Sequence, residues 1–542
     1  LAAYAHQLQQ NGVPTSDKVH LILGDLTHST HALEDILPTY LKRRQDMVSL
    51  IEARTANRNS GGAALLWGDD TYAACGRCAV CEPHVAANQD LFGIAGMRGE
   101  QRAKLRAAGI KSISALALAD DKPDNLNAKT FEKLRTQAKL QVKTLMLGDD
   151  AAPVFEVIEP AALSLIPSPD DGDIFFDFEG DPLYQEGTYW NLDYLFGWVD
   201  KDRKFMPLWA HDLAGERQAL IDFANYVRQL KAKHPLMHIY HYAPYEKTHL
   251  LSMAARHGVE EDFVDQLLRE NTLVDLYPIV RRAILVGSHS YSLKKLEPIF
   301  VLDEEREGVA NAADSVVEYA NYCELTANGQ HEAAAIKLKS IEDYNAYDCR
   351  STLALRNWMV GLAGENGVGL RGFVEPEARP EIAPDPVFVK LMAAIEHVPV
   401  VDRTKDQTAI ALAAAAIDFH RRENKSFWWE HYSRLKAPLD DWQDTRDVYV
   451  VEKMTVERDW HMEGRQKVQR RHLRLLTTPA PGSKLGVKDS VFLLYAPENE
   501  IYSNPINPGA RTDIKAKVKT PLVANGEIWN VQDAINARAE SG

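Results

Sequence analysis

Strand-like and helix-like patterns alternate in the middle of the chain. From residue 174 the runs IFFDFEG, YLFGWVD and KFMPLWAHD are separated by turn residues, which predicts three consecutive strands. An amphipathic stretch over 215–233 then predicts a helix, MHIYHY predicts a further strand, and Pro244 opens another helix, because proline is favoured in a first turn. Helical patterns continue to about residue 362. This order predicts a mixed α/β sheet with flanking helices.

The segments on either side follow other patterns. In the segment 1–87, residues 1–60 are mostly helical in pattern, and a Gly/Ala stretch and a cysteine cluster follow. Residues 88–150 contain short helices with turns. Proline and aspartate are frequent in 151–173, which predicts a linker. Residues 387–435 are helical in pattern, and residues 448–542 are β-rich with many Gly, Pro and Asn turns. We therefore expect several structural units, with a helical N-terminal region and a β-rich C-terminal region.

Composition and charge narrow the class of protein. The chain is 45% hydrophobic and 26% charged, without an apolar run long enough for a bilayer and without a signal-peptide pattern in LAAYAHQLQQ. Because an initiator methionine is also missing, we expect a fragment of a longer protein. The net charge of −15 argues against a basic nucleic-acid coat but is compatible with an acidic metal site. Five cysteines, three of them bunched, do not indicate a secreted disulfide framework, so we expect a cytoplasmic protein.

Two carboxylates lie on one face of the first predicted strand of the sheet. In DIFFDFEGDP, alternation directs Phe176 and Phe178 toward a core and directs Asp177 and Glu179 to the opposite face. Neighbouring carboxylates repel each other, which is costly unless a cation lies between them. Gly180 leaves room for the backbone of a substrate. A solvent-facing acidic edge is the alternative interpretation.

Two later segments add further candidate residues. In HIYHYAPYEKTHL, Glu246 falls in the first turn of a helix, where the helix dipole alone would also favour a carboxylate. In SIEDYNAYDCRSTLAL, Ser340 and Asp343 have the spacing of a capping-box variant and predict a helix start. Tyr344 and Asp348 are four residues apart and therefore share a helix face. A half-buried tyrosine beside a solvated aspartate is the alternative.

Taken in this order, the three acidic motifs resemble the DEDDy branch of the RNase H-like (DnaQ-like) 3′–5′ exonucleases. The closest resemblance is to the YprB-type domain of large RecB-like nuclease–helicase proteins, and it covers about 174–360, within a predicted domain of 174–362. YLFGWVD, DLYPIVRR and SYSLKKLEPIF resemble the same branch. The resemblance implies an RNase H-like fold, hydrolysis of single-stranded nucleic acid with DNA favoured over RNA, and a helicase domain or subunit as partner.

The resemblance also implies a role for each acidic residue. Asp177, Glu179, Glu246 and Asp348 would bind two Mg²⁺ or Mn²⁺ ions, hard cations that prefer carboxylate oxygens. Two ions roughly 3.5–4 Å apart can hold the attacking and leaving oxygens of a phosphodiester. Tyr344 would orient the attacking water. Many family members carry aspartate where this chain has Glu246, which leaves open a catalytically degenerate RNase H-like module that binds nucleic acid or connects domains.

The cysteine cluster forms a second candidate metal site. Cys75, Cys78 and Cys81 are closely spaced thiols, and three thiolates need a fourth ligand. His84 would complete a zinc site, whereas a cysteine before residue 1 would complete an iron–sulfur cluster. LAAYAHQL resembles the tail of the Gln-x-x-x-Tyr motif of RecB-type nucleases, which favours the second option and makes 1–87 an inactive remnant. Three incidental thiols without a metal are the alternative interpretation of the cysteine cluster.

The segment after the cysteines, DLFGIAGMRGEQRAKLRAAGIKSISALA, resembles a helix–hairpin–helix element, and a plain helical hairpin is the alternative.

Overall fold

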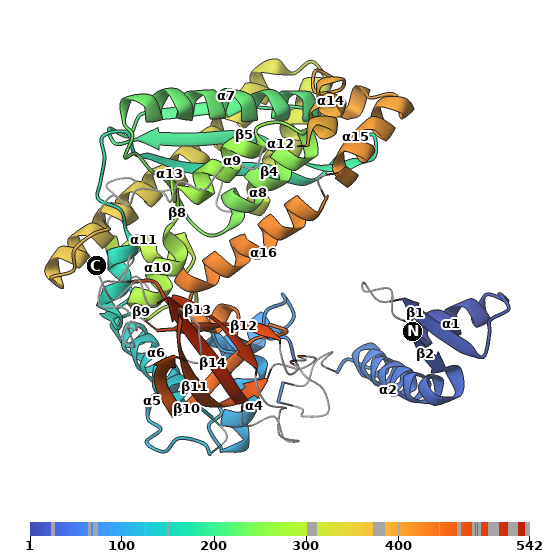
Figure 1. Ribbon diagram of the computed structural model, residues 1–542, viewed down its shortest axis with the longest axis vertical. Helices are drawn as coiled ribbons and strands as arrows, with labels where there is room; N and C mark the ends of the chain where they lie inside the picture. Colours follow the sequence, from blue (N-terminus) through green and yellow to red (C-terminus); the bar gives the residue numbers. More distant parts are fainter. Residues whose placement is uncertain are drawn as a thin grey trace. The chain divides into compact units, whose positions relative to one another are not determined.

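A computed structural model gives the structure of the chain (Figure 1). It describes residues 1–22, 28–62, 67–68, 74–124, 126–148, 151–300, 312–371, 385–398, 400–417, 419–443, 445–462, 468–479, 483, 485, 489–496, 509–518 and 529–536. Two compact units are present, one of Leu1–Gly93 with Arg98–Ala103 and one of Ile94–Met97 with Lys104–Gly542. No helix in the described part of the chain has both the length and the apolar character needed to cross a membrane.

The first unit contains a pair of strands that the sequence pattern did not predict. Strand β1 (Lys18–Ile22) pairs antiparallel with β2 (His28–Ala32), between helices α1 (Ala2–Gln10) and α2 (Leu33–Asn59). The helical expectation for 1–60 therefore holds for the two flanking helices but not for this pair of strands. A further helix, α3 (Glu82–Ala87), follows the cysteine cluster. Strand β2 reads HSTHA and has no alternation of large apolar side chains, so periodicity gave no strand signal.

Five strands of the second unit form a mixed sheet in the order β6-β5-β4-β7-β8. The antiparallel part consists of β4 (Ile174–Glu186), β5 (Tyr189–Asp200) and β6 (Phe205–Trp209). Strands β7 (Ile239–His241) and β8 (Leu273–Asp275) run parallel to β4. The predicted mixed α/β sheet is confirmed, and β4 lies at its centre with a hydrogen-bonded neighbour on each side.

Helices cover both faces of this sheet (Figure 1). On one face, Phe176 and Phe178 of β4 pack in a core with α7 (Leu213–Lys233), α8 (Tyr245–His257) and α9 (Glu261–Arg269). On the other face, Phe175 packs in a second core with α10 (Leu276–Ala283) and α13 (His331–Glu365). The alternation predicted for β4 is therefore observed, and the face that carries Asp177 and Glu179 is the one covered by α13.

Helix α13 corrects one prediction about its own start. It runs without a break for 35 residues, so Ser340 lies inside the helix and the predicted start at Ser340 is wrong. The preceding stretch HEAAAIKLK consists mostly of strong helix formers, and a helix that has already begun continues through a single serine. Tyr344 and Asp348 still lie one turn apart on α13, because their spacing does not depend on where the helix begins.

The segment 151–173 packs as part of the second unit rather than as a linker. Its strand β3 (Phe155–Val157) pairs with β9 (Ile284–Val286), and a 3-10 helix follows at Pro160–Leu165. Leu163 and Ile166 are buried in the same core as Phe175. The proline and aspartate residues at the ends of the segment led to the linker prediction, although the stretch between them is apolar. Before α13 the described chain also contains the helices α4 (Gly99–Ala107), α5 (Ile113–Ala117), α6 (Ala128–Leu147), α11 (Leu293–Phe300) and α12 (Ala312–Ala327).

The C-terminal part has the predicted helical and β-rich segments. The helices are α14 (Pro386–Ala393), α15 (Lys405–Ile417) and α16 (Phe419–Lys436). Five strands then form an antiparallel sheet in the order β10-β11-β14-β13-β12. They are β10 (Tyr449–Met462), β11 (Val468–Pro479), β12 (Ser490–Tyr495), β13 (Thr512–Val518) and β14 (Trp529–Asn536).

Candidate active site

Three of the predicted carboxylates meet where α13 crosses the middle of β4. Carboxylate oxygens of Asp177, Glu179 and Asp348 all lie within 4.8 Å of one another. Burial and the charges of Glu179 and the other acids raise the pKa of Asp177 well above its ordinary value. Burial also raises the pKa of Glu179 to about 8, against an opposing hydrogen bond from Ser315. This cluster resists ionisation unless positive charge is supplied.

The fourth predicted carboxylate approaches from α8. Glu246 is 2% exposed and lies within hydrogen-bonding reach of Asp177, whose pKa it raises. The Nδ1 atom of His241 is 3.0 Å from its Oε2. Glu246 does not belong to the group of three whose oxygens lie within 4.8 Å of one another. It therefore joins the cluster on the side of Asp177.

Tyr344 lies one turn before Asp348 on α13 and is 6% exposed. The Nζ atom of Lys294 is 5.1 Å from the centre of its ring, a cation–π distance. The charge of Lys294 also lowers the pKa of Glu179, so this lysine belongs to the surroundings of the cluster. In the sequence, Lys294 stands within SYSLKKLEPIF, where nothing local distinguishes it from Lys295.

Asn345 is a residue of the site that the sequence patterns did not identify. Its Nδ2 is 3.1 Å from Oδ2 of Asp177 and 3.5 Å from Oε1 of Glu179, and its side chain is fully buried. One amide group therefore donates to both carboxylates of β4. The sequence feature connected with Asn345 is a glycine elsewhere in the chain. Gly197 of β5 pairs with Asp177, and a Cβ atom at position 197 would lie 1.7 Å from Oδ1 of Asn345.

A short relay of hydroxyl groups reaches Glu179 from α12. Ser315 donates its proton to Oε2 of Glu179 at 2.8 Å. The hydroxyl of Tyr194 lies 2.6 Å from Oγ of Ser315. Because serine has only one proton to donate, Tyr194 must be the donor in that second bond. Ser315 and Tyr194 were both missed from the sequence, since buried hydroxyls become recognisable only through their tertiary partners.

Comparison with protein families agrees with this geometry. Residues 174–360 match the model of the RNase H superfamily. These residues form an RNase H-like domain. The match begins at the first residue of β4 and ends within α13, so it includes all the carboxylates described above. Comparisons with curated proteins and with solved structures give no match. An RNase H-like domain indicates a nuclease-related function on nucleic acid, and such domains typically use divalent metal ions.

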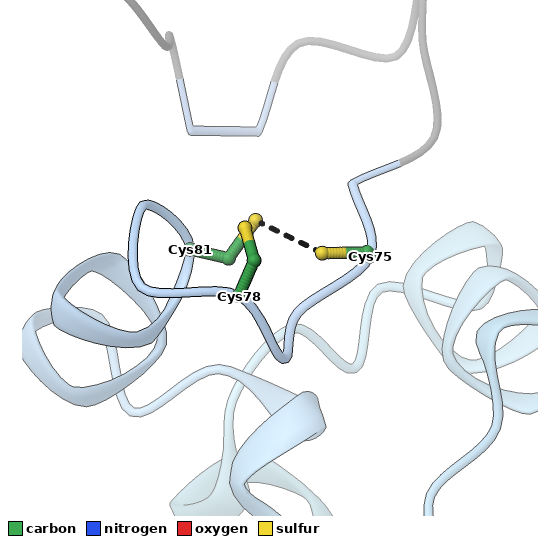
Figure 2. A group of neighbouring side chains, drawn as sticks. All are labelled: Cys75, Cys78 and Cys81. Atoms are coloured by element: carbon green, nitrogen blue, oxygen red, sulfur yellow. Dashed lines mark hydrogen bonds between the residues drawn. The ribbon is translucent and has the colours of Figure 1, made fainter. Parts of the chain in front are cut away.

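The cysteine cluster lies in the first unit, apart in sequence from the RNase H-like domain. Figure 2 shows Cys75, Cys78 and Cys81 with their sulfur atoms turned toward one another. The sulfurs of Cys75 and Cys81 are 3.7 Å apart, and all three lie within 4.8 Å of one another. A backbone hydrogen bond from Arg77, together with the neighbouring thiols, lowers the pKa of Cys75 to about 7. A lowered pKa favours the thiolate form, which is the form that binds metals.

His84 does not join these three sulfurs. Its ring stacks on Trp67, with the ring centres 5.7 Å apart and an angle of 5° between the planes. Within the described residues, the group that could hold a metal here contains the three cysteines and no histidine or carboxylate. The structure therefore brings together the predicted thiols but not the predicted histidine of a zinc site.

Proposed function

We propose that the RNase H-like domain is a metal-dependent exonuclease. It hydrolyses phosphodiester bonds of single-stranded nucleic acid from the 3′ end, with DNA favoured, and releases nucleoside 5′-monophosphates. The observation that supports this most is the cluster of four carboxylates, in which Glu179 and Glu246 are buried and Asp177 and Asp348 are half-buried. Two of the four, Asp177 and Glu179, have strongly raised pKa values. Burying several acids together is unfavourable, so the arrangement is understandable when cations compensate their charge.

The donor set fits two divalent cations. Asp177, Glu179, Glu246 and Asp348 offer only carboxylate oxygens, which suit Mg²⁺ or Mn²⁺. When bound, such ions stabilise charge on the phosphoryl oxygens and lower the pKa of water. Asn345 and Ser315 hold the two carboxylates of β4 in fixed orientations by donating hydrogen bonds to them. The carboxylates are then preorganised before substrate binds.

Two tyrosines support the substrate side of the proposal. Tyr344 lies one turn before Asp348 on α13. In this proposal its hydroxyl orients the attacking water rather than removing its proton, because an ordinary phenol has a pKa of about 10. Tyr245 is 41% exposed and stacks on His249, with ring centres 3.7 Å apart. A Cβ atom on Gly180 of β4 would lie 2.7 Å from Oδ1 of Asp193 and 3.0 Å from the hydroxyl of Tyr245, so this hydroxyl lies beside the strand that carries Asp177 and Glu179. An exposed tyrosine ring that is held in place by stacking on His249 can stack on a nucleobase.

End-labelled substrates test the proposed polarity. With Mn²⁺ and single-stranded DNA or RNA, a 5′ label should appear in a ladder that shortens stepwise, while a 3′ label should be released at once as a mononucleotide. The opposite pattern would refute 3′–5′ polarity, and internal cuts would refute an exonuclease. Folded protein that neither cleaves nor binds Mn²⁺ would instead indicate a degenerate module that binds nucleic acid or connects domains, the alternative suggested by Glu246.

We also propose that Cys75, Cys78 and Cys81 bind an iron–sulfur cluster or Zn²⁺, with a fourth ligand from outside the described residues. The mutual proximity of the three sulfurs supports this. In this proposal residues 1–87 are a remnant of a RecB-like nuclease, and a helicase domain or subunit is the partner. Metal analysis distinguishes the two cofactors, since an iron–sulfur cluster adds iron, sulfide and absorbance at roughly 400 nm. Protein purified without either metal would refute the site.

A further inference from the structure

The connection between β7 and α8 contains an unusual backbone conformation. Only Tyr242, Ala243 and Pro244 link the last residue of β7 to the first residue of α8. Ala243 has a φ of +77°, in the left-handed region. An L-residue with a side chain adopts this region at a cost of roughly 1–2 kcal/mol. Something in the surrounding structure must therefore hold this turn.

Two side chains hold both polar backbone groups of Ala243. The Oδ1 atom of Asp275 accepts a hydrogen bond from the amide of Ala243 at 2.9 Å and another from the amide of Tyr277 at 2.9 Å. The carbonyl oxygen of Ala243 lies 2.8 Å from Nδ1 of His241. A carbonyl can only accept, so Nδ1 carries the proton. His241 and Asp275 are opposite each other in the pairing of β7 with β8.

The same histidine also fixes Glu246. Its Nδ1 lies 3.0 Å from Oε2 of Glu246, so one N–H serves the turn and the carboxylate together. Helix α8 has no side-chain cap at its start, and the turn at Ala243 therefore sets the direction in which the helix leaves the sheet. Glutamate has one more rotatable bond than aspartate, and ordering a freely rotating side chain costs entropy. Fixing both the backbone and the carboxylate removes that freedom before a metal binds.

We propose that Asp275 and His241 are positioning residues, which hold the left-handed turn at Ala243 and thereby place Glu246 in the carboxylate cluster. Neither residue touches the reacting atoms. The inference rests on the proposed function, because it assigns Glu246 to the metal site. Asp275 is expected to hold the turn through its hydrogen-bond acceptor and not through its charge.

Substitutions at Asp275 separate the acceptor from the charge. Asp275→Ala removes both hydrogen bonds, whereas Asp275→Asn keeps an Oδ1 that can accept them. By calorimetry, Asp275→Ala should bind Mn²⁺ roughly 10–100-fold more weakly, as for other residues that orient metal ligands. Asp275→Asn should stay close to wild type. Asp212→Ala is the matched control, because Asp212 caps α7 by accepting from Gly215 at 2.6 Å, as Asp275 caps α10.

Substitutions at Ala243 test the turn without changing any charge. Ala243→Val should weaken Mn²⁺ binding, since a β-branched residue is strongly disfavoured at positive φ. In a double variant, Ala243→Gly should recover part of the Mn²⁺ affinity that Asp275→Ala loses, since glycine adopts this conformation freely. Hydrogen exchange of 242–250 in metal-free protein should be faster in Asp275→Ala and near wild type in Asp275→Asn. This second readout does not depend on catalysis.

Two results would overturn the inference. Equal loss of Mn²⁺ affinity in Asp275→Asn and Asp275→Ala would show that the charge is what matters, and wild-type affinity in Asp275→Ala would show that the turn is not needed. If Asp275→Ala does not fold, Ala243→Val replaces it as the test, and wild-type Mn²⁺ affinity in Ala243→Val would overturn the inference. Wild-type protein that binds Mn²⁺ but cleaves no nucleic acid would refute the proposed function and leave this inference standing.

Discussion

The side chain of Asn345 occupies the space that a side chain at position 197 would need. A Cβ atom on Gly197 would lie 1.7 Å from Oδ1 of Asn345 and 2.9 Å from the ring of Phe205. Glycine in β5 therefore allows α13 to come close enough for Asn345 to hydrogen-bond with Asp177. The glycine at position 197 of β5 thus determines how the carboxylate of Asp177 on the neighbouring strand β4 is held.

We predict that Gly197→Ala displaces Asn345 and disturbs the carboxylate cluster. The new methyl group has no free space, and overpacking of this kind typically destabilises by about 1–3 kcal/mol. Nuclease activity and Mn²⁺ affinity should both fall by at least about tenfold. Thermal unfolding, calorimetry and the cleavage assay measure these effects. Gly364→Ala is the control, because a Cβ atom at this position of α13 meets no atom within 4 Å. Similar behaviour of the two variants would contradict the account.

Removal of the Ser315 hydroxyl should shift the pH dependence of metal binding. The hydrogen bond from Ser315 lowers the pKa of Glu179, so Ser315→Ala should raise that pKa further and require a higher pH for Mn²⁺ binding. At pH 7 we expect about tenfold weaker binding. Ser315→Thr keeps a hydroxyl and is the conservative comparison. Titration of Mn²⁺ affinity from pH 6 to 9 tests this, and superimposable curves for wild type and Ser315→Ala would contradict it.

The sequence predicted the main chain elements better than the contacts between them. Alternation in IFFDFEG predicted which side chains of β4 face each core, because a strand has a period of two whatever surrounds it. The spacing of Tyr344 and Asp348 likewise survived the wrong helix start at Ser340. Asn345 and Ser315 could not be found this way. Their role depends on donors reaching carboxylates more than 130 residues away in sequence, as Ser315 does with Glu179 (|i−j| = 136).

Stability of the metal-free protein should fall as pH rises from about 4.5 to about 8. The pKa of Glu179 is raised from 4.5 to about 8, so the folded state binds more protons than the unfolded state in this window. The stabilising, protonated form is fully present below the unfolded pKa and is lost as pH rises through the folded pKa. The loss should be on the order of 2–4 kcal/mol.

Denaturant unfolding across this pH range, with chelator present, measures the loss. Glu179→Gln should reduce the slope of the profile, because glutamine does not titrate and Asp177 is then the remaining group with a strongly raised pKa on β4. Saturating Mn²⁺ should restore stability at pH 8. A metal-free profile that rises between pH 5 and 8 and is unaffected by Glu179→Gln would show that the cluster does not carry the raised pKa.

Tyr344→Phe should separate catalysis from metal binding. The phenyl ring keeps the packing under Lys294 and loses only the hydroxyl that is proposed to orient water. We expect kcat to fall about 10²-fold with little change in KM, Mn²⁺ affinity or thermal stability. Single-turnover kinetics on a short oligonucleotide provide the measurement. An unchanged kcat would remove Tyr344 from the proposed mechanism, and a parallel loss of Mn²⁺ affinity would assign it a structural role.

The most direct test of the central claim compares two single-atom substitutions in a Mn²⁺-dependent cleavage assay. Asp177→Asn changes a carboxylate of the cluster, whereas Asp343→Asn changes a carboxylate on α13 whose side chain is 59% exposed and paired with Lys339. Wild type and Asp343→Asn should release nucleoside 5′-monophosphates from single-stranded DNA at similar rates, and folded Asp177→Asn should release none. Equal release by all three proteins would contradict the assignment of the carboxylate cluster as the nuclease site.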